Sequence, residues 1–299
     1  NAFMTALVHW FQRKRGTASA FLGMGQAMGY VGVYPVTLLL VIFGWRDAIF
    51  IAAIGFLVIS LPLAQIIRHR PEPYGYLPDG RKSTSEDLKP PSPNNILGAE
   101  EESFTVKDAM KHPSFWLLLL ARALYGLTTT VHHVHQIPHM INRGFTTQGS
   151  GLLVAYYGLT QMVGRLVFGP IADRIGRHRM YMLCFLMLGA GWFAFAFISP
   201  QSIWSVVIFF FFYGTGHAAH TVTSQTVVAD FFGTKRYATI RGIMSTLSLV
   251  ISVMGPVYAG VMFDIFNNYT LAFLILGPII TVGTLSVYLA GTPKLSGVN

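Results

Sequence analysis

The sequence has little charge and almost no cysteine. Of its 299 residues only 11% are charged and 53% are hydrophobic, whereas about 25% of the residues of a soluble globular protein are charged. Its one cysteine, Cys184, excludes a disulfide within the chain. Aspartate and glutamate are missing from the interior of every long apolar stretch. These deficits disfavour a water-soluble domain and indicate a chain that is embedded in a membrane.

Long apolar runs make up most of the chain. A membrane-spanning helix needs ~20 mainly apolar residues, and eight stretches meet this requirement: residues 17–43, 46–67, 114–138, 149–171, 180–199, 202–229, 238–263 and 269–290. Residues 1–11 look like the end of a ninth span, so we expect the complete protein to have further spans before this chain. The predicted fold is an all-α membrane protein, a helical bundle with eight complete transmembrane helices and a stub of a ninth.

Lysine and arginine are concentrated in alternate connections between the predicted spans. One set of connections holds 17 of the 21 basic residues, whereas the other set holds only Arg46 and Arg143. Because basic loops stay on the cytoplasmic side of a membrane, residues 68–112 and 172–179 are predicted to face the cytoplasm. The net charge of +9 then reflects orientation in the lipid bilayer. A nucleic-acid partner is not expected, because its binding surface would not be divided among five loops.

The polar segment 68–112 divides the chain. It contains Pro90-Pro91-Ser92-Pro93 and Glu100-Glu101-Glu102, a composition typical of a flexible linker. Near its end, Thr105 and Asp108 have the spacing of a capping box, which predicts a helix start. We therefore expect residues 1–67 to end an N-terminal six-helix half, residues 68–112 to form a cytoplasmic linker, and residues 113–299 to form a C-terminal six-helix half.

A short basic motif lies between two of the spans. Residues 169–179 read Gly-Pro-Ile-Ala-Asp-Arg-Ile-Gly-Arg-His-Arg, which is a G-x-x-x-D-R-x-G-R pattern. Such a turn closes two helix ends tightly, pairs Asp173 with an arginine and keeps positive charge on one membrane face. The pattern resembles the loop signature of the major facilitator superfamily of secondary transporters. The resemblance assigns a conformational role to Gly169, Asp173, Arg174, Gly176 and Arg177.

Two further segments narrow the resemblance. Trp10-Phe11-x-Arg13-Lys14-Arg15-Gly16 and His112-Pro113-Ser114-Phe115-Trp116 are similar to the branch that holds monocarboxylate transporters and oxalate:formate antiporters. The resemblance implies an integral, multi-pass protein of the plasma or inner cell membrane. It also implies alternating-access transport of a small organic anion, with a monocarboxylate as the expected substrate and a proton or counter-anion as the coupling partner. No cofactor and no metal are implied.

An arginine inside an apolar span is the leading candidate for the binding site. A charge at the bilayer centre costs about 2.5–3.5 kcal/mol on insertion scales and usually has a function. In the resembled branch, an arginine at the place of Arg165 binds the substrate carboxylate. Gln161 stands one helical turn earlier, where monocarboxylate members have an aspartate. The alternative is a structural Arg165 that pairs with loop groups near the cytoplasmic end of its helix.

Three other polar residues inside spans complete the predicted substrate site. Arg122 lies ~13 Å along its helix, where it would bind an anion or pair with an acid. His217 and His220 are three residues apart on one helix face, which fits either a polar cavity or hydrogen-bonded packing. A further group, His132, His133, His135 and His139, is predicted to line an outer polar vestibule and not to bind metal, because adjacent members point to different faces.

Three other functions are compared with carboxylate transport: a sensor, a carrier of another solute and an intramembrane enzyme. A transporter-like sensor, or a carrier of a solute other than a carboxylate, would have the same sequence features. An intramembrane serine protease would need a motif like Gly-x-Ser-x-Gly, and Gly149-Ser150-Gly151 at a span entrance does not supply it. We therefore expect that the protein is not an enzyme.

Overall fold

The computed structural model describes residues 10, 23–25, 27–66, 76–77, 81–82, 104–233 and 236–291, with the side chains of Ile66, Tyr76, Leu77, Arg81, Lys82, Asp173, Gln225 and Thr226 outside the description. The chain separates into two compact units, one of residues 1–26 and 35–100 and the other of residues 27–34 and 101–299. The predicted division at residues 67 and 112 stays a prediction.

A long apolar helix, α3 (Val33–Ile66), provides most of the described part of the first unit. Gly44 interrupts it with a φ of 78°, close to the predicted boundary between the spans 17–43 and 46–67. Ile42 and Phe56 are 69% and 71% exposed, as expected for a helix whose surroundings are lipid. The predicted linker also contains a short antiparallel hairpin of β1 (Tyr76–Leu77) and β2 (Arg81–Lys82), which the sequence analysis did not predict.

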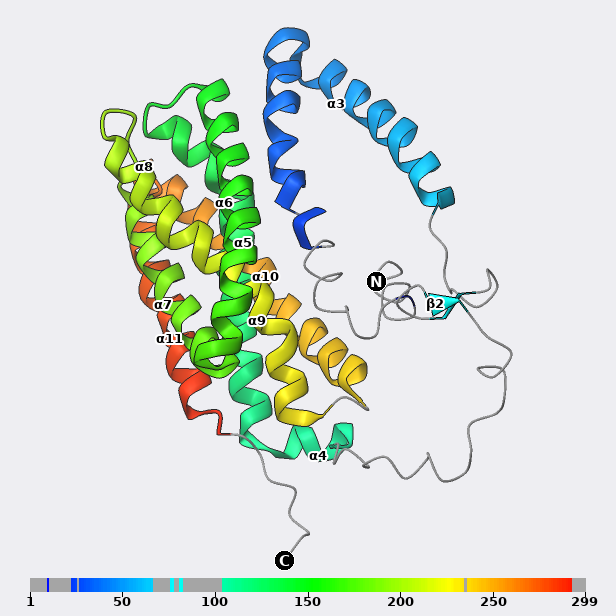
Figure 1. Ribbon diagram of the computed structural model, residues 1–299. Helices are drawn as coiled ribbons and strands as arrows, with labels where there is room; N and C mark the ends of the chain where they lie inside the picture. The colour runs from blue at the N-terminus through cyan, green and yellow to red at the C-terminus, as the bar shows by residue number, and fades with distance from the viewer. Residues whose placement is uncertain are drawn as a thin grey trace, which may run out of the picture. The chain divides into compact units, whose positions relative to one another are not determined.

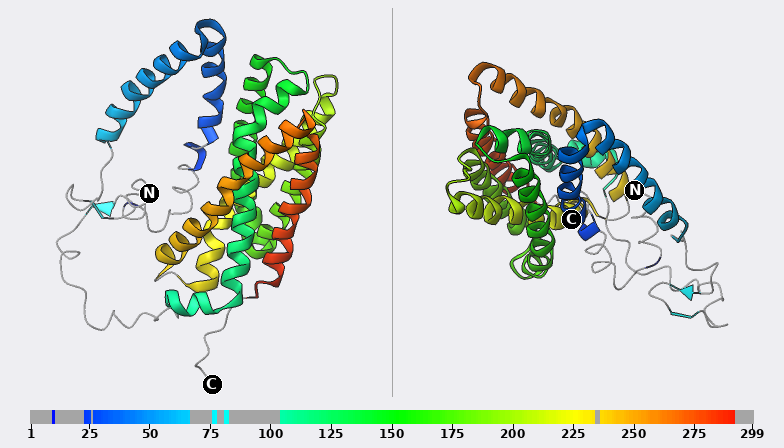
Figure 2. Two further views of the ribbon diagram at one scale, coloured as in Figure 1. Left: turned by 180° about the vertical axis from the view of Figure 1, so that it is seen from behind. Right: turned by 90° about the horizontal axis from the view of Figure 1, so that it is seen from above.

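The second unit is a bundle of antiparallel helices (Figures 1 and 2). In order, its helices are α4 (Val106–Lys111), α5 (Pro113–Asn142), α6 (Thr147–Ile175), α7 (Arg177–Ala196), α8 (Ile203–Phe209), η4 (Phe210–Gly214), α9 (Thr215–Phe232), α10 (Tyr237–Phe266) and α11 (Thr270–Leu289). The elements α8, η4 and α9 follow one another without a break and form a single helical stretch, in which η4 is a π-helical turn.

Within the described residues, each of the eight predicted spans falls mainly on a helix. Six helical stretches within the described ranges are long and apolar enough to cross a membrane: Gly23–Gln65, Pro113–Asn142, Thr147–Ala172, Arg177–Ala196, Tyr237–Phe266 and Thr270–Leu289. The first covers the described parts of the predicted spans 17–43 and 46–67, and the remaining span, 202–229, is the stretch that η4 divides. The predicted all-α membrane fold is therefore confirmed. Of the ninth-span stub, 1–11, only Trp10 lies within the described residues.

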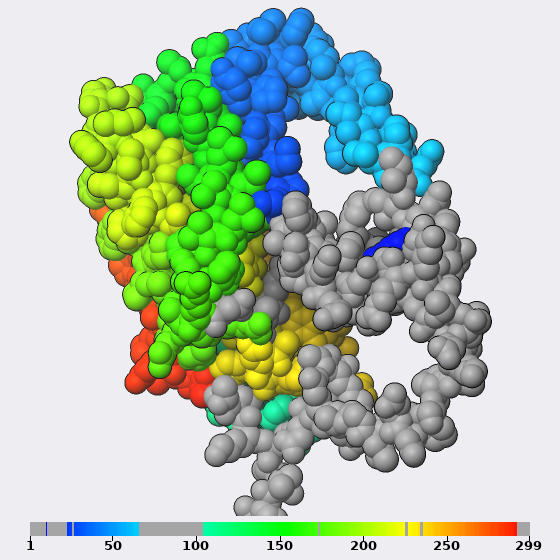
Figure 3. Space-filling view, viewed as in Figure 1, coloured from blue at the N-terminus to red at the C-terminus, as the bar shows by residue number. Residues whose placement is uncertain are grey.

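Close helix packing holds the bundle together. Helix α11 packs on α7 and α5, α10 packs on α5, and α9 packs on α7 and α6. Glycine permits two of the closest approaches: a Cβ added to Gly255 would collide with the carbonyl oxygen of Leu127, and one added to Gly191 would lie 2.7 Å from the Cα of Tyr213. Figure 3 shows closely packed side chains on the side of the bundle that faces the viewer. Small residues allow such contact between membrane helices.

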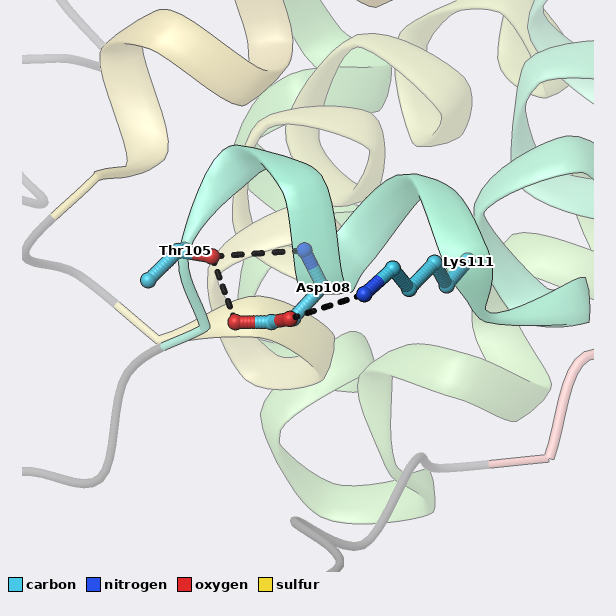
Figure 4. Close-up of polar contacts among 3 residues, drawn as sticks. All are labelled: Thr105, Asp108 and Lys111. Carbon is cyan, nitrogen blue, oxygen red and sulfur yellow. Dashed lines mark hydrogen bonds and ion pairs between the residues drawn. The ribbon is translucent and has the colours of Figure 1, made fainter.

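The short helix α4 starts as its sequence predicts. Thr105 is the N-cap residue, and its hydroxyl oxygen accepts a hydrogen bond from the Asp108 backbone N–H at 3.3 Å (Figure 4). The Asp108 carboxylate accepts in turn from the Thr105 hydroxyl, and Lys111 lies 3.9 Å from it. The ion pair is exposed and adds little stability, so the cap is the main reason that the helix begins at this point.

Three connections meet at one end of the bundle. The backbone N–H of Phe104, at the end of the predicted linker, donates to the carbonyl of Phe232 at 3.2 Å. Arg177, at the start of α7, forms an ion pair of 3.2 Å with Asp230, near the end of α9. The end of the linker and the basic motif therefore lie at the same end of this unit, as the charge distribution predicted (Figure 1).

The basic motif forms a shorter turn than expected. Residues 172–179 were predicted to be a loop, but α6 runs to Ile175 and α7 begins at Arg177. Gly176 alone leaves the helical conformation, with a φ of 92° that glycine adopts without strain. The predicted pairing of Asp173 falls on a side chain outside the described set. Arg177 forms an ion pair with Asp230, a partner that the sequence analysis missed because it is 53 residues away.

Candidate anion-binding site

Arg165 lies in the interior of the second unit. Its side chain is only 5% exposed, and it projects from the C-terminal half of α6, a helix that begins at the Thr146 cap. One guanidinium nitrogen, Nη2, donates to Gln161 Oε1 at 3.3 Å. Nε and Nη1 have no hydrogen-bond partner within the described part of the chain. Arg165 thus keeps most of its donors unused in a buried position.

A defined chain of hydrogen bonds connects α6 to α9 and α5. Because arginine can only donate, the Gln161 atom that faces Arg165 is its carbonyl oxygen. His217 Nδ1 lies 2.9 Å from the same oxygen and must therefore carry the proton. The other ring nitrogen, Nε2, then accepts from the Tyr125 hydroxyl at 2.7 Å. These contacts specify the tautomer of a neutral His217, with its proton on Nδ1.

His220 continues this network toward α7. Its ring stacks on Tyr125 with centroids 3.4 Å apart and an angle of 12° between the planes. Its Nε2 lies 3.5 Å from the Tyr181 hydroxyl, and the side chain is 4% exposed. His217 and His220 are therefore both buried and within hydrogen-bond distance of polar side chains, and the choice between a polar cavity and hydrogen-bonded packing stays a prediction.

Tyrosines surround the site, and the sequence analysis did not select them. Tyr157 packs against His217 with centroids 5.9 Å apart, and Tyr30 meets Tyr157 edge to face at 5.1 Å. The Tyr30 hydroxyl pairs with His133 Nε2 at 2.7 Å. A tyrosine in an apolar run looks like a packing residue. The only available signal was that a buried hydroxyl needs a hydrogen-bond partner.

Arg122 lies in a neighbouring pocket. Its Nη2 donates to Ser245 Oγ at 2.9 Å, and the pocket is lined by Leu118, Arg122, Tyr181, Ser224, Val227, Val228, Arg241 and Met244. Tyr181 borders both this pocket and His220. The structure thus brings Arg165, Gln161, His217 and His220 together, and it places Arg122 beside them without a direct hydrogen bond to any of the four.

The charge of the site is not balanced by an acid on any side chain that the structure describes. Asp47, Asp108, Asp230 and Asp264 are all exposed near helix ends or helix breaks. Two of these carboxylates form ion pairs, Asp108 with Lys111 and Asp230 with Arg177, and both pairs lie outside the site. The buried Arg165 guanidinium can therefore accept an anion as its counterion.

The second histidine group is divided: His133 is exposed and His135 is half-buried, whereas the other two members lie in the interior. His132 and His139 are fully buried, which contradicts the prediction for these two residues. His139 Nε2 lies 2.8 Å from the carbonyl oxygen of Phe195, and His135 Nε2 lies 3.0 Å from that of Pro256. Packing of aromatic residues between α5 and α7 encloses this end of α5. Within the described ranges, no three His, Cys, Asp or Glu residues are grouped as metal ligands.

Comparison with known proteins gives consistent results over both parts of the chain. The family model described as Major Facilitator Superfamily matches residues 1–145 and 137–299. Monocarboxylate transporter 12 of Rattus norvegicus is 26% identical over 287 residues, which cover 90% of this chain and 58% of that protein. MFS transporter asaE of Aspergillus flavus is 25% identical over 291 residues, covering 94% and 59%. Monocarboxylate transporter 11 of Homo sapiens is 25% identical over 297 residues, covering 96% and 58%.

The chain spans somewhat more than half the length of these relatives. Their names are those of transporters and not of enzymes. The family match covers both predicted halves, and the helices have the length and apolar character of membrane spans. The chain is therefore a multi-pass integral membrane protein that belongs to the major facilitator superfamily.

Proposed function

We propose that the full-length protein is a secondary transporter that carries a small organic carboxylate by alternating access, and that Arg165 binds the carboxylate. The observation that carries the proposal is the buried Arg165 guanidinium, whose Nε and Nη1 have no partner among the described residues. Arginine stays charged even when it is buried, and its planar fork matches the geometry of a carboxylate. A bound carboxylate would supply both the missing hydrogen bonds and the missing negative charge.

The surroundings of Arg165 favour a small anion with an apolar portion. Gln161 holds one side of the guanidinium, and the rings of Tyr157 and Tyr30 lie close by. A few placed polar groups within aromatic walls are typical of small-molecule sites. The names of the monocarboxylate transporter relatives support the same class of substrate. Superfamily transporters hold their substrates near the bilayer midplane between two helical halves, and α6 belongs to one such half.

Transport by the purified full-length protein in proteoliposomes tests the proposal. Uptake of lactate, pyruvate, formate and oxalate should be compared for wild type, Arg165→Lys and Arg165→Ala. Arg165→Lys keeps the charge but loses the fork, so the KM should rise about tenfold, because a hydrogen bond to a charged group contributes about 1.5–3 kcal/mol. Arg165→Ala should nearly abolish uptake.

Arg143→Ala is the matched control. Arg143 donates to the carbonyl of Ile198 at 3.0 Å, at the end of α5 and away from the site, so its loss should leave the KM unchanged. Carboxylate transport that survives Arg165→Ala would give Arg165 a structural role. If wild type moves none of the carboxylates, the substrate class is wrong, and a sensor or a carrier of another solute takes its place.

A further inference from the structure

We propose that His217 is the proton-binding group of this transporter, and that a proton on His217 and a carboxylate on Arg165 bind cooperatively. The inference rests on the proposed function, and it names the coupling ion that the sequence left open. It makes the protein a proton-linked carrier with no buried acid among the described side chains of the second unit.

One amide group separates the imidazole from the guanidinium. Gln161 Oε1 accepts from Arg165 Nη2 at 3.3 Å and from His217 Nδ1 at 2.9 Å. The second ring nitrogen of His217, Nε2, is the acceptor and is therefore where a proton would add. The Tyr125 hydroxyl, 2.7 Å away, can turn from donor to acceptor, because a phenol oxygen does both. Protonation thus requires no movement of the heavy atoms.

The charges of the site couple the two binding events. Without substrate, a proton on His217 would add a second positive charge beside Arg165, and like charges disfavour ionisation. A carboxylate bound to Arg165 cancels the first charge and provides an attractive partner for the second. Proton and carboxylate therefore each raise the affinity for the other by the same factor. The loaded site then carries the same net charge as the empty one.

Among the described histidines near His217, His133 pairs with the Tyr30 hydroxyl and not with Gln161, so His217 is the one that shares an acceptor with Arg165. Three tyrosines contact His217: Tyr125 of α5, Tyr157 of α6 and Tyr213 of η4. His133 of α5 and Arg165 of α6 lie near it. The tyrosines are neutral at physiological pH, and Arg165 does not release its proton. His220, on the same helix as His217, stacks on Tyr125 and lies on the side of the Arg122 and Arg241 pocket.

A buried group of exchangeable polar atoms leads away from His217. His132 has no hydrogen-bond partner for either ring nitrogen in the described chain, and the same holds for the Tyr157 and Tyr213 hydroxyls. Ring centroids are 4.5 Å apart between His132 and Tyr213, and 6.4 Å apart between Tyr213 and His217. Buried polar atoms of this kind are usually satisfied by ordered water. His132 lies ~28 Å along α5 from its first residue, so the group extends toward the opposite end of the bundle from Phe104.

The test measures protons moved per carboxylate in weakly buffered proteoliposomes that contain a pH-sensitive dye and the full-length protein. Wild type should move about one proton per carboxylate. His217→Gln and His217→Asn should bring this ratio close to zero at whatever rate remains, because neither amide titrates. His139→Gln is the control: it removes another buried histidine, which contacts the Phe195 carbonyl outside this network, and its ratio should equal that of wild type.

A second measurement needs only wild type. Addition of carboxylate to the purified protein near pH 7 should cause proton uptake from solution. A His217 variant that moves as many protons per carboxylate as wild type would overturn the inference. Wild-type protein that transports or binds carboxylate without taking up protons would also overturn it, but would leave the proposed function standing. Wild type that transports no carboxylate would instead reject the proposed function itself, and the inference with it.

Discussion

At the scale of single residues, Gln161 determines the chemistry of the site. Its one carbonyl oxygen accepts hydrogen bonds from both Arg165 and His217, and the side chain is fully buried. An amide orients the two donors without neutralising either. A carboxylate at the same place would pair with Arg165 and compete with any external anion. The neutral residue therefore keeps the guanidinium available.

Gln161→Glu tests this role. Glutamate has nearly the same shape as glutamine and would accept from Arg165 and His217 with a full negative charge. Because charge-assisted hydrogen bonds are about twice as strong as neutral ones, the KM for an external carboxylate should rise about tenfold or more. Gln148→Glu is the control, since it makes the same change at an exposed position in the first turn of α6. Equal KM values for the two variants would contradict the role assigned to Gln161.

The sequence identified the charged and titratable members of the site but not their neighbours. Arg165 was selected because a charge inside an apolar run is costly, and Gln161 because it lies one turn from Arg165. Tyr125 and Tyr30 were missed, since the contacts that make them part of the site join residues 92 and 103 positions apart. The burial of His132 was missed for the same reason: the rings that enclose it come from α6, α7 and η4.

At the scale of helices, local sequence accounts for the existence of each element but not for its irregularities. Apolar length predicted the spans, and the Thr105 cap predicted the start of α4. The π-helical turn η4 has no comparable signal. It lies where Tyr213 packs directly on Gly191 of α7, so its backbone follows the neighbouring helix as well as its own sequence. Single-turn π segments occur often at functional sites, and His217 stands one turn further along α9.

Gly191→Ala tests this contact. The new Cβ would lie within 2.6–2.8 Å of Tyr213 atoms, including backbone N and Cα, so α7 and η4 would have to separate. Overpacking of this kind costs about 1–3 kcal/mol, and thermal unfolding in detergent should show a Tm several degrees lower. Gly260→Ala on α10 has no atom within 4 Å of the new Cβ and should not lower the Tm. If the Gly191→Ala protein has the Tm of wild type, α7 and η4 can separate at little cost, which would contradict the tight contact between Gly191 and Tyr213.

At the scale of the whole molecule, the charge distribution and the helix contacts agree on which connections share a face. The charge count grouped the linker with the basic motif, and the contacts of Phe104 with Phe232 and of Arg177 with Asp230 bring the same regions to one end of the second unit. Positive loops are retained on the cytoplasmic side, so this end is predicted to face the cytoplasm. Sequence alone could predict the side but not the pairing of Arg177 with Asp230.

Labelling of single cysteines with a membrane-impermeant maleimide in intact cells tests this orientation. The natural Cys184 is fully buried and should give little background. Ser83→Cys in the linker and Arg179→Cys at the start of α7 should react only after the cells are permeabilised. Gln201→Cys should react in intact cells, because the 20 residues of α7 span ~30 Å, about the thickness of the hydrocarbon core. Reaction of Ser83→Cys and Arg179→Cys from opposite sides would separate the linker from the basic motif and contradict the charge argument. Reaction of Arg179→Cys and Gln201→Cys from the same side would contradict the assignment of α7 as a complete span.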